Sequence, residues 1–357
     1  MKRVWFVADA RTVGGAEVYL ERLALGLSGW DPAFLLPRRE TLGAWRDCLV
    51  SRGLAVREYG PGPGGWWQAA RQARSGCDLV HVNLPSTYDG GQGVLPWILA
   101  RGSGKPVVTT EHLTELGRSR RRRLLKRLTA GAVAATITVS EASRRRLIGE
   151  GLSPQRVVCV PNGVPDPGPP DPFPPTAEGI RIGVLASLEP RKQIDVLIRA
   201  AADAPRNLIL HLAGSGPLRK ELESLAASLG LGPDRVRFVG RVDDPYRFLA
   251  GCHVLALPSR LEGMPLSILE AKAAGRGVFA SALPGMDEIV HDGVDGRLLP
   301  SGDVTAWTGA LTEAAVDPAH LLRWACAARE DFEEHYTAEA WVGATAALYA
   351  RVLGSVR

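Results

Sequence analysis

Long apolar runs are missing from this chain of 357 residues. No stretch approaches the roughly 20 residues that a helix needs to cross a bilayer. The N-terminal segment MKRVWFVADA begins with basic residues, turns apolar and soon meets Asp9, and no cleavage site of small residues follows. That pattern favours a first buried strand over a signal peptide. These absences predict a soluble protein of the cytoplasm with about two domains.

Cysteine is also scarce, and the spacing of the cysteines indicates neither a metal site nor a set of disulfides. The five cysteines are odd in number, and no two have the C-x-x-C spacing of zinc or redox motifs. Neither a disulfide framework nor a zinc site is indicated, which fits a reducing compartment. Aromatic residues are absent from the most basic segment, 118–127, and no recognition module accompanies it. Nucleic-acid binding is therefore not expected.

What the sequence does contain is a regular alternation of short apolar runs and helical patterns. The runs are almost continuously hydrophobic, which favours strands of a parallel sheet covered on both faces. In the first half, strands are expected at 3–9, 77–83, 106–112, 136–140 and 157–162, with helices at 17–27, 121–133 and 141–151 among them. In the second half, strands are expected at 180–187, 207–216, 235–240, 253–259 and 277–282.

A proline-rich stretch separates the two halves. Residues 161–179 hold eight prolines between Pro161 and Pro175, so they can form neither a helix nor a central strand. We expect an extended, semi-rigid linker. Two α/β halves joined by one linker predict a two-domain, doubly wound architecture. The last segment, 337–353, has the spacing of an amphipathic helix.

The most informative segment is HVLALPSRLEGMPLSILEAKAAG, residues 253–275. A strand leads into a loop with Glu262, and a helix is expected from about Pro265 to near Gly275. Glu270 falls inside that helix. The N–H groups of Gly263, Met264 and Leu266 can face an anion at the helix mouth. Two carboxylates on either side of an anion site suit a nucleotide-sugar, which has a diphosphate between two hydroxyl-rich sugars.

Glu262 and Glu270, separated by seven residues within PSRLEGMPLSILEAKAAG, resemble the E-x7-E motif of the family-4 retaining glycosyltransferases. The resemblance covers nearly the whole chain and is densest in the second half. It implies an α/β protein of the GT-B fold, with two doubly wound Rossmann-like domains that face each other across a cleft. The expected domains are residues 1–164, which bind the acceptor, and residues 165–336, which bind the nucleotide-sugar. The final helix, 337–357, would pack back on the first domain.

The resemblance also implies a set of site residues. Glu262 would hold the sugar hydroxyls, Glu270 the ribose hydroxyls, and His112 would lie beside the transferred sugar. The expected catalytic residues are His112, Glu262 and Lys192. The expected donor-binding residues are Gly14, Gly15, Ser187, Arg191, Lys192, Gly214, Arg241, Val242, Glu262, Gly263, Met264, Pro265, Leu266 and Glu270.

One position departs from the family pattern. The family has Gly-Arg-Leu, a few residues, and then Lys-Gly at the start of the second domain. Here the lysine is Lys192, but the arginine position holds Ser187. A charged contact to phosphate contributes about 1.5–3 kcal/mol, so its loss matters. Three alternatives stay open: Arg191 replaces the arginine, Lys192 acts with a helix N-terminus alone, or the donor site is altered.

By resemblance the reaction retains the anomeric configuration, and a phosphate oxygen takes the acceptor proton. No protein nucleophile is needed, and no cofactor or metal is expected. The acidic pair Asp243–Asp244 precedes Pro245 and is typical of a turn or helix start rather than of a metal site. The expected partners are a nucleotide-sugar donor and a hydroxyl acceptor, with UDP as the default nucleotide and GDP as the alternative. The acceptor, lipid-linked, anionic or neither, is not indicated.

The basic segment 118–127 has two open interpretations. Its cations either meet anionic lipid headgroups or a phosphorylated acceptor at the membrane, or form a solvated helix face. The residues concerned are Arg118, Arg120, Arg121, Arg122, Arg123, Lys126 and Arg127.

Two rival functions remain at this point. Ser187 motivates a GT-B pseudoenzyme that binds nucleotide-sugar or membrane as an assembly partner. A GT-B isomerase or phosphorylase is a third reading, but the context of the E-x7-E motif matches the transferases better. Release of a nucleoside diphosphate from a donor separates an active transferase from a pseudoenzyme.

Overall fold

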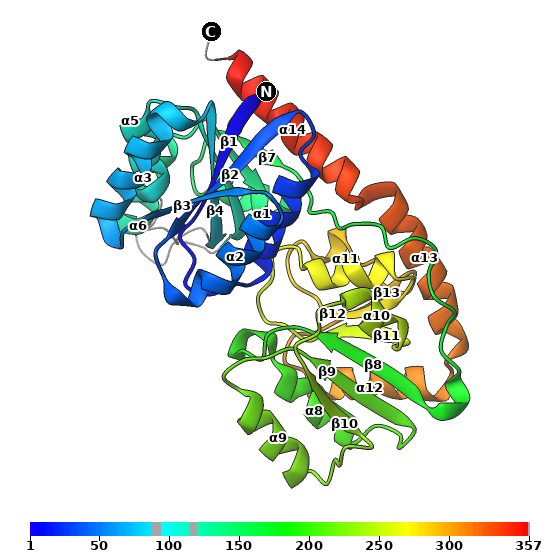
Figure 1. The fold of residues 1–357 in the computed structure, drawn as a ribbon. Coiled ribbons are helices and arrows are strands. Elements are labelled where there is room, and N and C mark those ends of the chain that lie inside the picture. Colours follow the sequence, from blue (N-terminus) through cyan, green and yellow to red (C-terminus); the bar gives the residue numbers. More distant parts are fainter. Residues whose placement is uncertain (87–93, 115–119, 356–357) are drawn as a thin grey trace. The chain divides into compact units, whose positions relative to one another are not determined.

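The computed structural model describes residues 1–86, 94–114 and 120–355 (Figure 1). Two compact units are present: unit 1 comprises residues 1–162 and 338–357, and unit 2 comprises residues 163–337. The helices and strands of unit 1 are β1 (Lys2–Ala8), α1 (Gly15–Gly26), β2 (Trp30–Pro37), α2 (Gly43–Ser51), β3 (Ala55–Tyr59), α3 (Gly62–Gly76), β4 (Leu79–Ser86), α5 (Val94–Ser103), β5 (Val107–Leu113), α6 (Arg120–Ala130), β6 (Ala135–Thr138), α7 (Glu141–Gly149), β7 (Val157–Cys159) and α14 (Ala338–Gly354).

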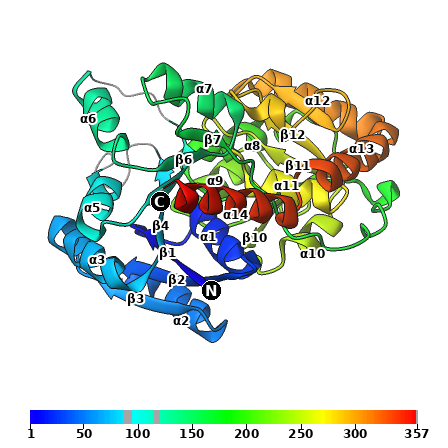
Figure 2. The same ribbon diagram turned by 90° about the horizontal axis from the view of Figure 1, so that it is seen from above.

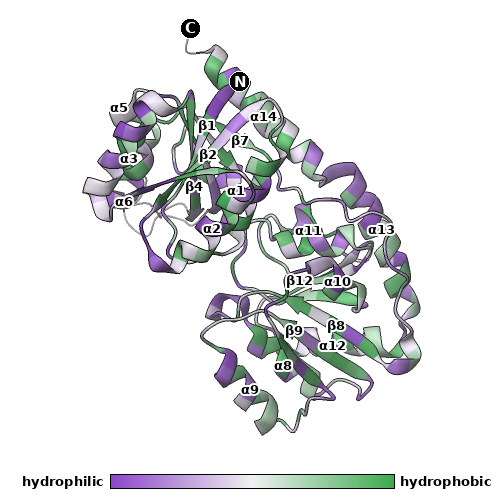
Figure 3. Cartoon of the chain, in the orientation of Figure 1, coloured by the Kyte–Doolittle hydropathy of each residue, from purple (hydrophilic) through white to green (hydrophobic). Residues whose placement is uncertain are grey.

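Unit 1 is built on a parallel sheet of seven strands in the order β3-β2-β1-β4-β5-β6-β7. Side chains of β1 alternate between two cores, as the two-residue period of a strand requires. Val4 and Phe6 pack with residues of α1, α2 and α14, whereas Trp5 and Val7 pack with residues of α3 and α5. Helices therefore cover both faces, and Figure 3 shows hydrophobic colour predominating on the strands.

The last helix, α14, belongs to the core of unit 1. Its buried residues Trp341, Leu348, Tyr349 and Val352 line one face at helical spacing and join the cluster around β1 and α1. The Tyr349 hydroxyl hydrogen-bonds to Nδ1 of buried His81, whose Nε2 lies 2.8 Å from Oγ1 of Thr110. The C-terminal segment is thus fixed to the sheet by both apolar packing and a buried polar chain.

Unit 2 contains a second parallel sheet, of six strands in the order β10-β9-β8-β11-β12-β13. A large apolar cluster joins one face of this sheet to α8, α9 and α12, while α10 and α11 contact the strands β8, β11 and β12. Its elements are β8 (Ile180–Leu185), α8 (Ile194–Ala202), β9 (Leu208–Ala213), α9 (Arg219–Ser228), β10 (Val236–Gly240), α10 (Pro245–Ala250), β11 (Val254–Leu257), α11 (Leu266–Ala273), β12 (Gly277–Ser281), β13 (Gly296–Leu299), α12 (Val304–Val316) and α13 (Ala319–His335).

The strand order fixes where each sheet can bind a ligand. In unit 2 the order runs outward in opposite directions from the neighbours β8 and β11, and in unit 1 from β1 and β4. At such a switch point the following loops diverge and leave a crevice at the carboxyl ends of the strands. The loop after β8 carries Lys192, the loop after β11 carries Glu262, and the loop after β1 carries Gly14. Figure 2 gives the second view of both sheets.

The proline-rich stretch is extended, as predicted, but it is packed against unit 2. No helix or strand forms between residues 165 and 175, and this segment lies along unit 2. Phe173 packs against the main core of unit 2, and the guanidinium of buried Arg276 lies over its ring. Asp166 pairs with Arg329 at 2.8 Å. Most of the expected linker is therefore part of the second unit.

The predicted fold class, α/β with two doubly wound parallel sheets, is confirmed. All ten expected strands are present within a few residues of their expected bounds. Three strands were not predicted: β2, β3 and β13. Among the described residues, no helix combines the length and the apolar character needed to traverse a bilayer.

Candidate functional site

The loops after β8 and β11 bring a lysine and a glutamate together at the switch point of unit 2. The Lys192 ammonium donates a hydrogen bond to Oε1 of Glu262, and both side chains are almost completely buried. Ser259 Oγ donates to the same carboxylate oxygen at 2.6 Å. Burial lowers the pKa of Lys192, and the charge of Glu262 opposes that shift. This pair is charge-balanced in itself, so an added anion needs further positive charge.

Arg191 supplies that further charge. Its Nη1 lies 3.5 Å from Oε2 of Glu262, and its Nε lies 3.1 Å from Oε2 of Glu189. The side chain is one-third exposed, so the guanidinium is accessible from solvent. Ser187, at the family's arginine position, lies four residues earlier in the same loop. A second cation is therefore present beside Lys192 although Ser187 cannot provide it.

The residue after Lys192 has an unusual backbone. Gln193 has φ 49° and ψ 41° and is the sole non-glycine residue with positive φ in the described part of the chain. The family has glycine here, which adopts this left-handed conformation at little cost. Ser301 Oγ donates to the Gln193 side chain at 2.8 Å. This hydrogen bond anchors the end of the loop that presents Lys192 and Arg191.

Helix α11 begins one residue later than predicted, at Leu266, with Pro265 as its N-cap. No side chain caps it. Within the described residues, the N–H groups of Gly263, Leu266 and Ser267 donate no hydrogen bond, so they remain available to an anion. Glu270 is buried on the helix, and Met264 is buried in the loop before it.

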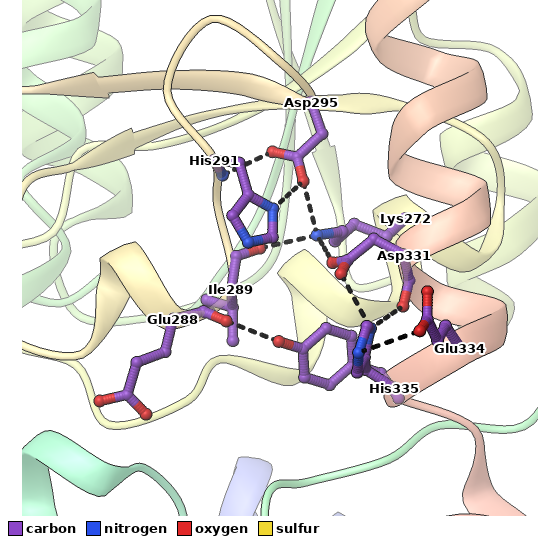
Figure 4. A network of polar contacts seen from close by, with 9 residues as sticks. Lys272, Glu288, Ile289, His291, Asp295, Asp331, Glu334 and His335 are labelled. Carbon is purple, nitrogen blue, oxygen red and sulfur yellow. Dashed lines mark hydrogen bonds and ion pairs between the residues drawn. The ribbon is translucent and has the colours of Figure 1, made fainter.

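A buried ion cluster holds α11 in place (Figure 4). The Lys272 ammonium donates to Oδ2 of Asp295 at 2.9 Å, to the carbonyl of Ile289 at 2.8 Å, and to Asp331 of α13. His291 contacts Asp295 at 2.9 Å. His291, Asp295 and Asp331 have a spacing that would suit a metal, but the lysine already stands as the cation between the two carboxylates. We interpret the cluster as structural.

The loops after β9 and β10 lie at the same sheet edge. A Cβ at Gly214 would lie 1.8 Å from the carbonyl oxygen of Ala186, so only glycine fits between these two loops. Arg241 and Val242 follow β10, with Arg241 exposed. Asp244 caps α10 by accepting hydrogen bonds from Tyr246 and Arg247, which confirms the prediction of a helix start there.

In unit 1 one of the two amides of the glycine turn, Gly14–Gly15, already has a hydrogen-bond partner. Gly14 is the N-cap of α1, and its N–H donates to the carboxylate of buried Glu17 at 2.9 Å. The role of this amide at a diphosphate stays a prediction, and it would require the Gly14 amide to exchange its present partner Glu17 for the phosphate. Gly15 is the first residue of the helix, and a Cβ there would meet nothing within 4 Å.

His112 lies near the carboxyl end of β5 in a defined protonation state. Asn83 donates through Nδ2 to the carbonyl of Ala16, so its Oδ1 accepts from His112 Nε2 at 2.8 Å. The ring is thus a neutral Nε2–H tautomer with a lone pair on Nδ1. Burial lowers the pKa of His112 to about 4. Tyr19 packs edge-on against the ring at 4.6 Å.

One residue of the basic segment was placed wrongly. Lys126 does not lie on the surface: it is buried and pairs with fully buried Glu111 of β5. An unpartnered charge inside a protein is costly, so the glutamate recruits the one lysine that helix α6 turns inward. Arg120, Arg121, Arg123 and Arg127 are exposed as predicted. Arg118 lies outside the described residues, and α6 includes Arg122 in its backbone.

Several residues that shape the site were not predicted. Ser259 and Ser301 orient Glu262 and Gln193, and Asn83 fixes the tautomer of His112. Ser259 and Ser301 lie two residues past the ends of β11 and β13, and Asn83 lies in the second half of β4. Polar residues near the carboxyl ends of parallel strands are the signal that could have found them.

Two family models match the chain. "Glycosyltransferase Family 4" matches residues 13–166, and "Glycosyl transferases group 1" matches residues 174–331. The first range ends and the second begins within the proline-rich stretch. The first holds Gly14, Gly15 and His112, and the second holds the E-x7-E motif.

Curated relatives match the chain over part of their length. A D-inositol 3-phosphate glycosyltransferase of Mycolicibacterium vanbaalenii is 34% identical over 175 residues, which are 44% of this chain and 39% of that protein. A lipopolysaccharide core biosynthesis glycosyltransferase, LpsE, of Rhizobium meliloti is 33% identical over 150 residues, 42% of this chain and 44% of that protein. The matches therefore span about two fifths of these relatives.

Solved structures resemble the whole chain. Anabaena HepE, in complex with UDP and glucose, superposes with a TM-score of 0.84 at 21% identity and covers 98% of this chain and 100% of that one. Sucrose-phosphate synthase from Thermosynechococcus elongatus gives a TM-score of 0.82 at 21% identity, covering 99% and 100%. With both halves matched by family models and this architecture, the chain belongs to glycosyltransferase family 4 and has the GT-B fold.

Proposed function

We propose that this protein is a retaining glycosyltransferase that moves a hexose-type sugar from a nucleoside-diphosphate donor to an acceptor hydroxyl. The observation that carries the proposal is the cluster of Lys192, Glu262 and Arg191 at the switch point of unit 2, beside the uncapped N-terminus of α11. It combines two cations, free amides, the buried carboxylate of Glu262 and the exposed carboxylate of Glu189, and a diphosphate attached to a sugar would take the place of these carboxylates beside the cations.

In the proposed reaction the bond between the anomeric carbon and the diphosphate oxygen breaks, and negative charge builds on the departing diphosphate. Lys192, Arg191 and the amides of Gly263 and Leu266 stabilise that charge. Such electrostatic stabilisation of the transition state is usually the largest single contribution to catalysis. These groups supply the positive field that a divalent ion provides in other transferases. We expect turnover to persist in the presence of a chelator.

Glu262 changes its role when the donor binds. Its carboxylate neutralises Lys192 in the structure described here. A diphosphate beside Lys192 takes over that role, and Glu262 is then available to accept hydrogen bonds from sugar hydroxyls. Glu270 on α11 is assigned to the ribose hydroxyls, and Arg241 and Val242 to the base.

The acceptor oxygen forms the new bond from the face that the diphosphate leaves, and a phosphate oxygen takes its proton. His112, held neutral by Asn83, assists the placement of the sugar and the acceptor. No protein carboxylate is required as nucleophile. UDP is the proposed nucleotide, because solved proteins of similar fold bind UDP, and GDP is the alternative.

Donor screening tests the proposal. A nucleotide-sugar that binds the folded protein raises its melting temperature, so UDP, GDP and their sugars should separate in a thermal-shift series. The donor that binds is then incubated with a panel of hydroxyl acceptors, and the anomeric configuration of the product is determined by NMR. Retention supports the proposal, whereas an inverted product contradicts it. Binding without release of nucleoside diphosphate over long incubation would favour the pseudoenzyme reading instead.

A further inference from the structure

Two leucines project into solvent from an arginine-rich helix of unit 1. Leu124 and Leu128 are 57% and 67% exposed and lie one turn apart on α6. With 3.6 residues per turn, they fall in the middle of the exposed arc of the helix. Arg120, Arg123 and Arg127 lie on one side of them and Arg121 on the other. Covering these two side chains with an apolar partner would be favourable, because it would remove them from water.

The opposite face of α6 fixes this orientation. Lys126 and Thr129 point inward, where Lys126 pairs with buried Glu111 and Thr129 hydrogen-bonds to the carbonyl of Leu125 at 3.0 Å. The inward ion pair means that α6 cannot roll to hide its leucines without leaving the Glu111 charge unpaired inside the unit.

The arginines of the outer face are not neutralised. In the part of the chain that the structure describes, no carboxylate forms an ion pair with Arg120, Arg121, Arg123 or Arg127. Three of them, Arg120, Arg123 and Arg127, line a shallow hollow together with Leu124 and residues 149–150. Three guanidinium groups around one hollow suit a phosphate group.

The hollow continues into a basic band. A second hollow shares Arg127 with the first, and a third shares Arg156 with the second. The third also holds Arg101, Lys105 and Arg351, from α5, the loop before β5 and α14. Along the three hollows Glu150 is the one acidic residue among the lining positions. Figures 1 and 2 show α6 at the periphery of unit 1, beside α5.

We propose that unit 1 docks on an anionic lipid bilayer through the outer face of α6, with Leu124 and Leu128 inserted among the headgroups and the arginines on lipid phosphates. An interfacial helix combines a cationic border with apolar residues in this way. A flexible anionic polymer or a nucleic acid would use the cations but would leave both leucines in water. This surface belongs to unit 1 and includes none of the residues proposed to bind the donor in unit 2. Membrane binding can therefore be measured without measuring the transferase reaction.

The test is co-sedimentation of the full chain with vesicles of phosphatidylcholine alone and of phosphatidylcholine mixed with phosphatidylglycerol. The protein should pellet with the mixed vesicles and not with the neutral ones, and the binding should weaken at salt well above about 0.1 M. The triple variant Arg120→Gln, Arg123→Gln, Arg127→Gln should bind about 100-fold more weakly. Leu124→Ser with Leu128→Ser should lose about 10-fold.

A matched control comes from unit 2. Arg199, Arg206 and Arg323 are exposed and make no ion pair with any described residue, so their replacement by Gln removes the same charge elsewhere. This control should bind the mixed vesicles nearly as the parent does. All variants change surface positions, and unchanged melting temperatures establish that they are folded.

Three results would overturn the proposal. One is absence of binding to anionic vesicles at low salt. Another is an equal loss in the α6 variant and in the unit 2 control, which would mean diffuse attraction rather than docking. The third is binding that is unchanged by the leucine substitutions and is displaced by a soluble polyphosphate. That result would assign the basic band to an anionic polymer instead.

Discussion

Among single residues, Arg191 and Ser187 decide where the second cation of the proposed diphosphate site comes from. The family's arginine position holds Ser187, and the guanidinium of Arg191 lies beside Lys192 and Glu262. If Arg191 replaces the missing arginine, its loss should be repaired by restoring an arginine four residues earlier.

We therefore expect Arg191→Met to lower kcat/KM for the donor by about 10- to 100-fold, the value of one charged contact to phosphate. The double variant Ser187→Arg with Arg191→Met should recover most of that loss. Initial rates of nucleoside diphosphate release measure both. A double variant as slow as Arg191→Met, or an Arg191→Met variant as fast as the parent, would assign the second cation elsewhere.

Ser259 carries a second prediction at this scale. Its hydroxyl donates to the Glu262 carboxylate at 2.6 Å and holds it toward Lys192. Ser259→Ala should reduce kcat/KM for the donor by about 10-fold, since a hydrogen bond to a charged group contributes about 1.5–3 kcal/mol. Ser228→Ala, on the exposed end of α9, is the control and should be silent. Identical kinetics for both variants would contradict the role given to Ser259.

Some of these residues could be predicted from the sequence, and others could not. Glu262 and Glu270 were predicted because the E-x7-E motif fixes their spacing, and Lys192 was predicted because it stands at the family's lysine position. The partners of a charge are set by the tertiary structure, so nothing in RRRRLLKR indicated that Lys126 alone turns inward to Glu111.

At the scale of elements, α11 depends on a buried ion cluster for its position. Lys272, on the helix that also carries Glu270, lies between Asp295 in the loop before β13 and Asp331 of α13. Two carboxylates that face one another without their cation repel each other, and burial forbids water from compensating.

Lys272→Met is therefore expected to lower the free energy of unfolding by about 3–5 kcal/mol. Adding Asp331→Asn should restore part of that loss, because it removes one of the two stranded charges. Urea unfolding followed by circular dichroism measures both. If the double variant is less stable than Lys272→Met, the cluster is not held together by charge.

The composition of the strands explains which of them could be predicted from the sequence. Strands such as β11 and β12 are buried along their whole length and are almost continuously apolar in sequence. By contrast, β2 contains Pro32 and Asp31, and the short edge strand β3 contains the adjacent charged residues Arg57 and Glu58. Pro within a run argues against a strand, and a short charged edge strand resembles a loop, so neither was predicted.

At the scale of the whole molecule, buried histidines make stability depend on pH. Burial lowers the pKa of His81 to about 3 and the pKa values of His112 and His253 to about 4. Unfolded histidines titrate near about 6.5, so between pH 6.5 and pH 4 the unfolded chain binds more protons than the folded one. Stability is then lost as the pH falls through this window.

Each of these histidines should cost about 1.5 kcal/mol between pH 6.5 and pH 5. The melting temperature should fall over this range, and His253→Gln should flatten the dependence by about one third. Differential scanning calorimetry at closely spaced pH values measures the slope. A melting temperature that stays constant or rises on acidification would show that these rings titrate freely in the folded chain.

The central claim is that Lys192 stabilises the diphosphate as it leaves the sugar, and single-turnover release of nucleoside diphosphate from the donor identified by screening tests it most directly. We expect slow release by the parent chain and a rate on the order of 100-fold lower in Lys192→Ala, with donor binding largely kept. A Lys192→Ala variant that releases the nucleotide as fast as the parent would contradict the claim.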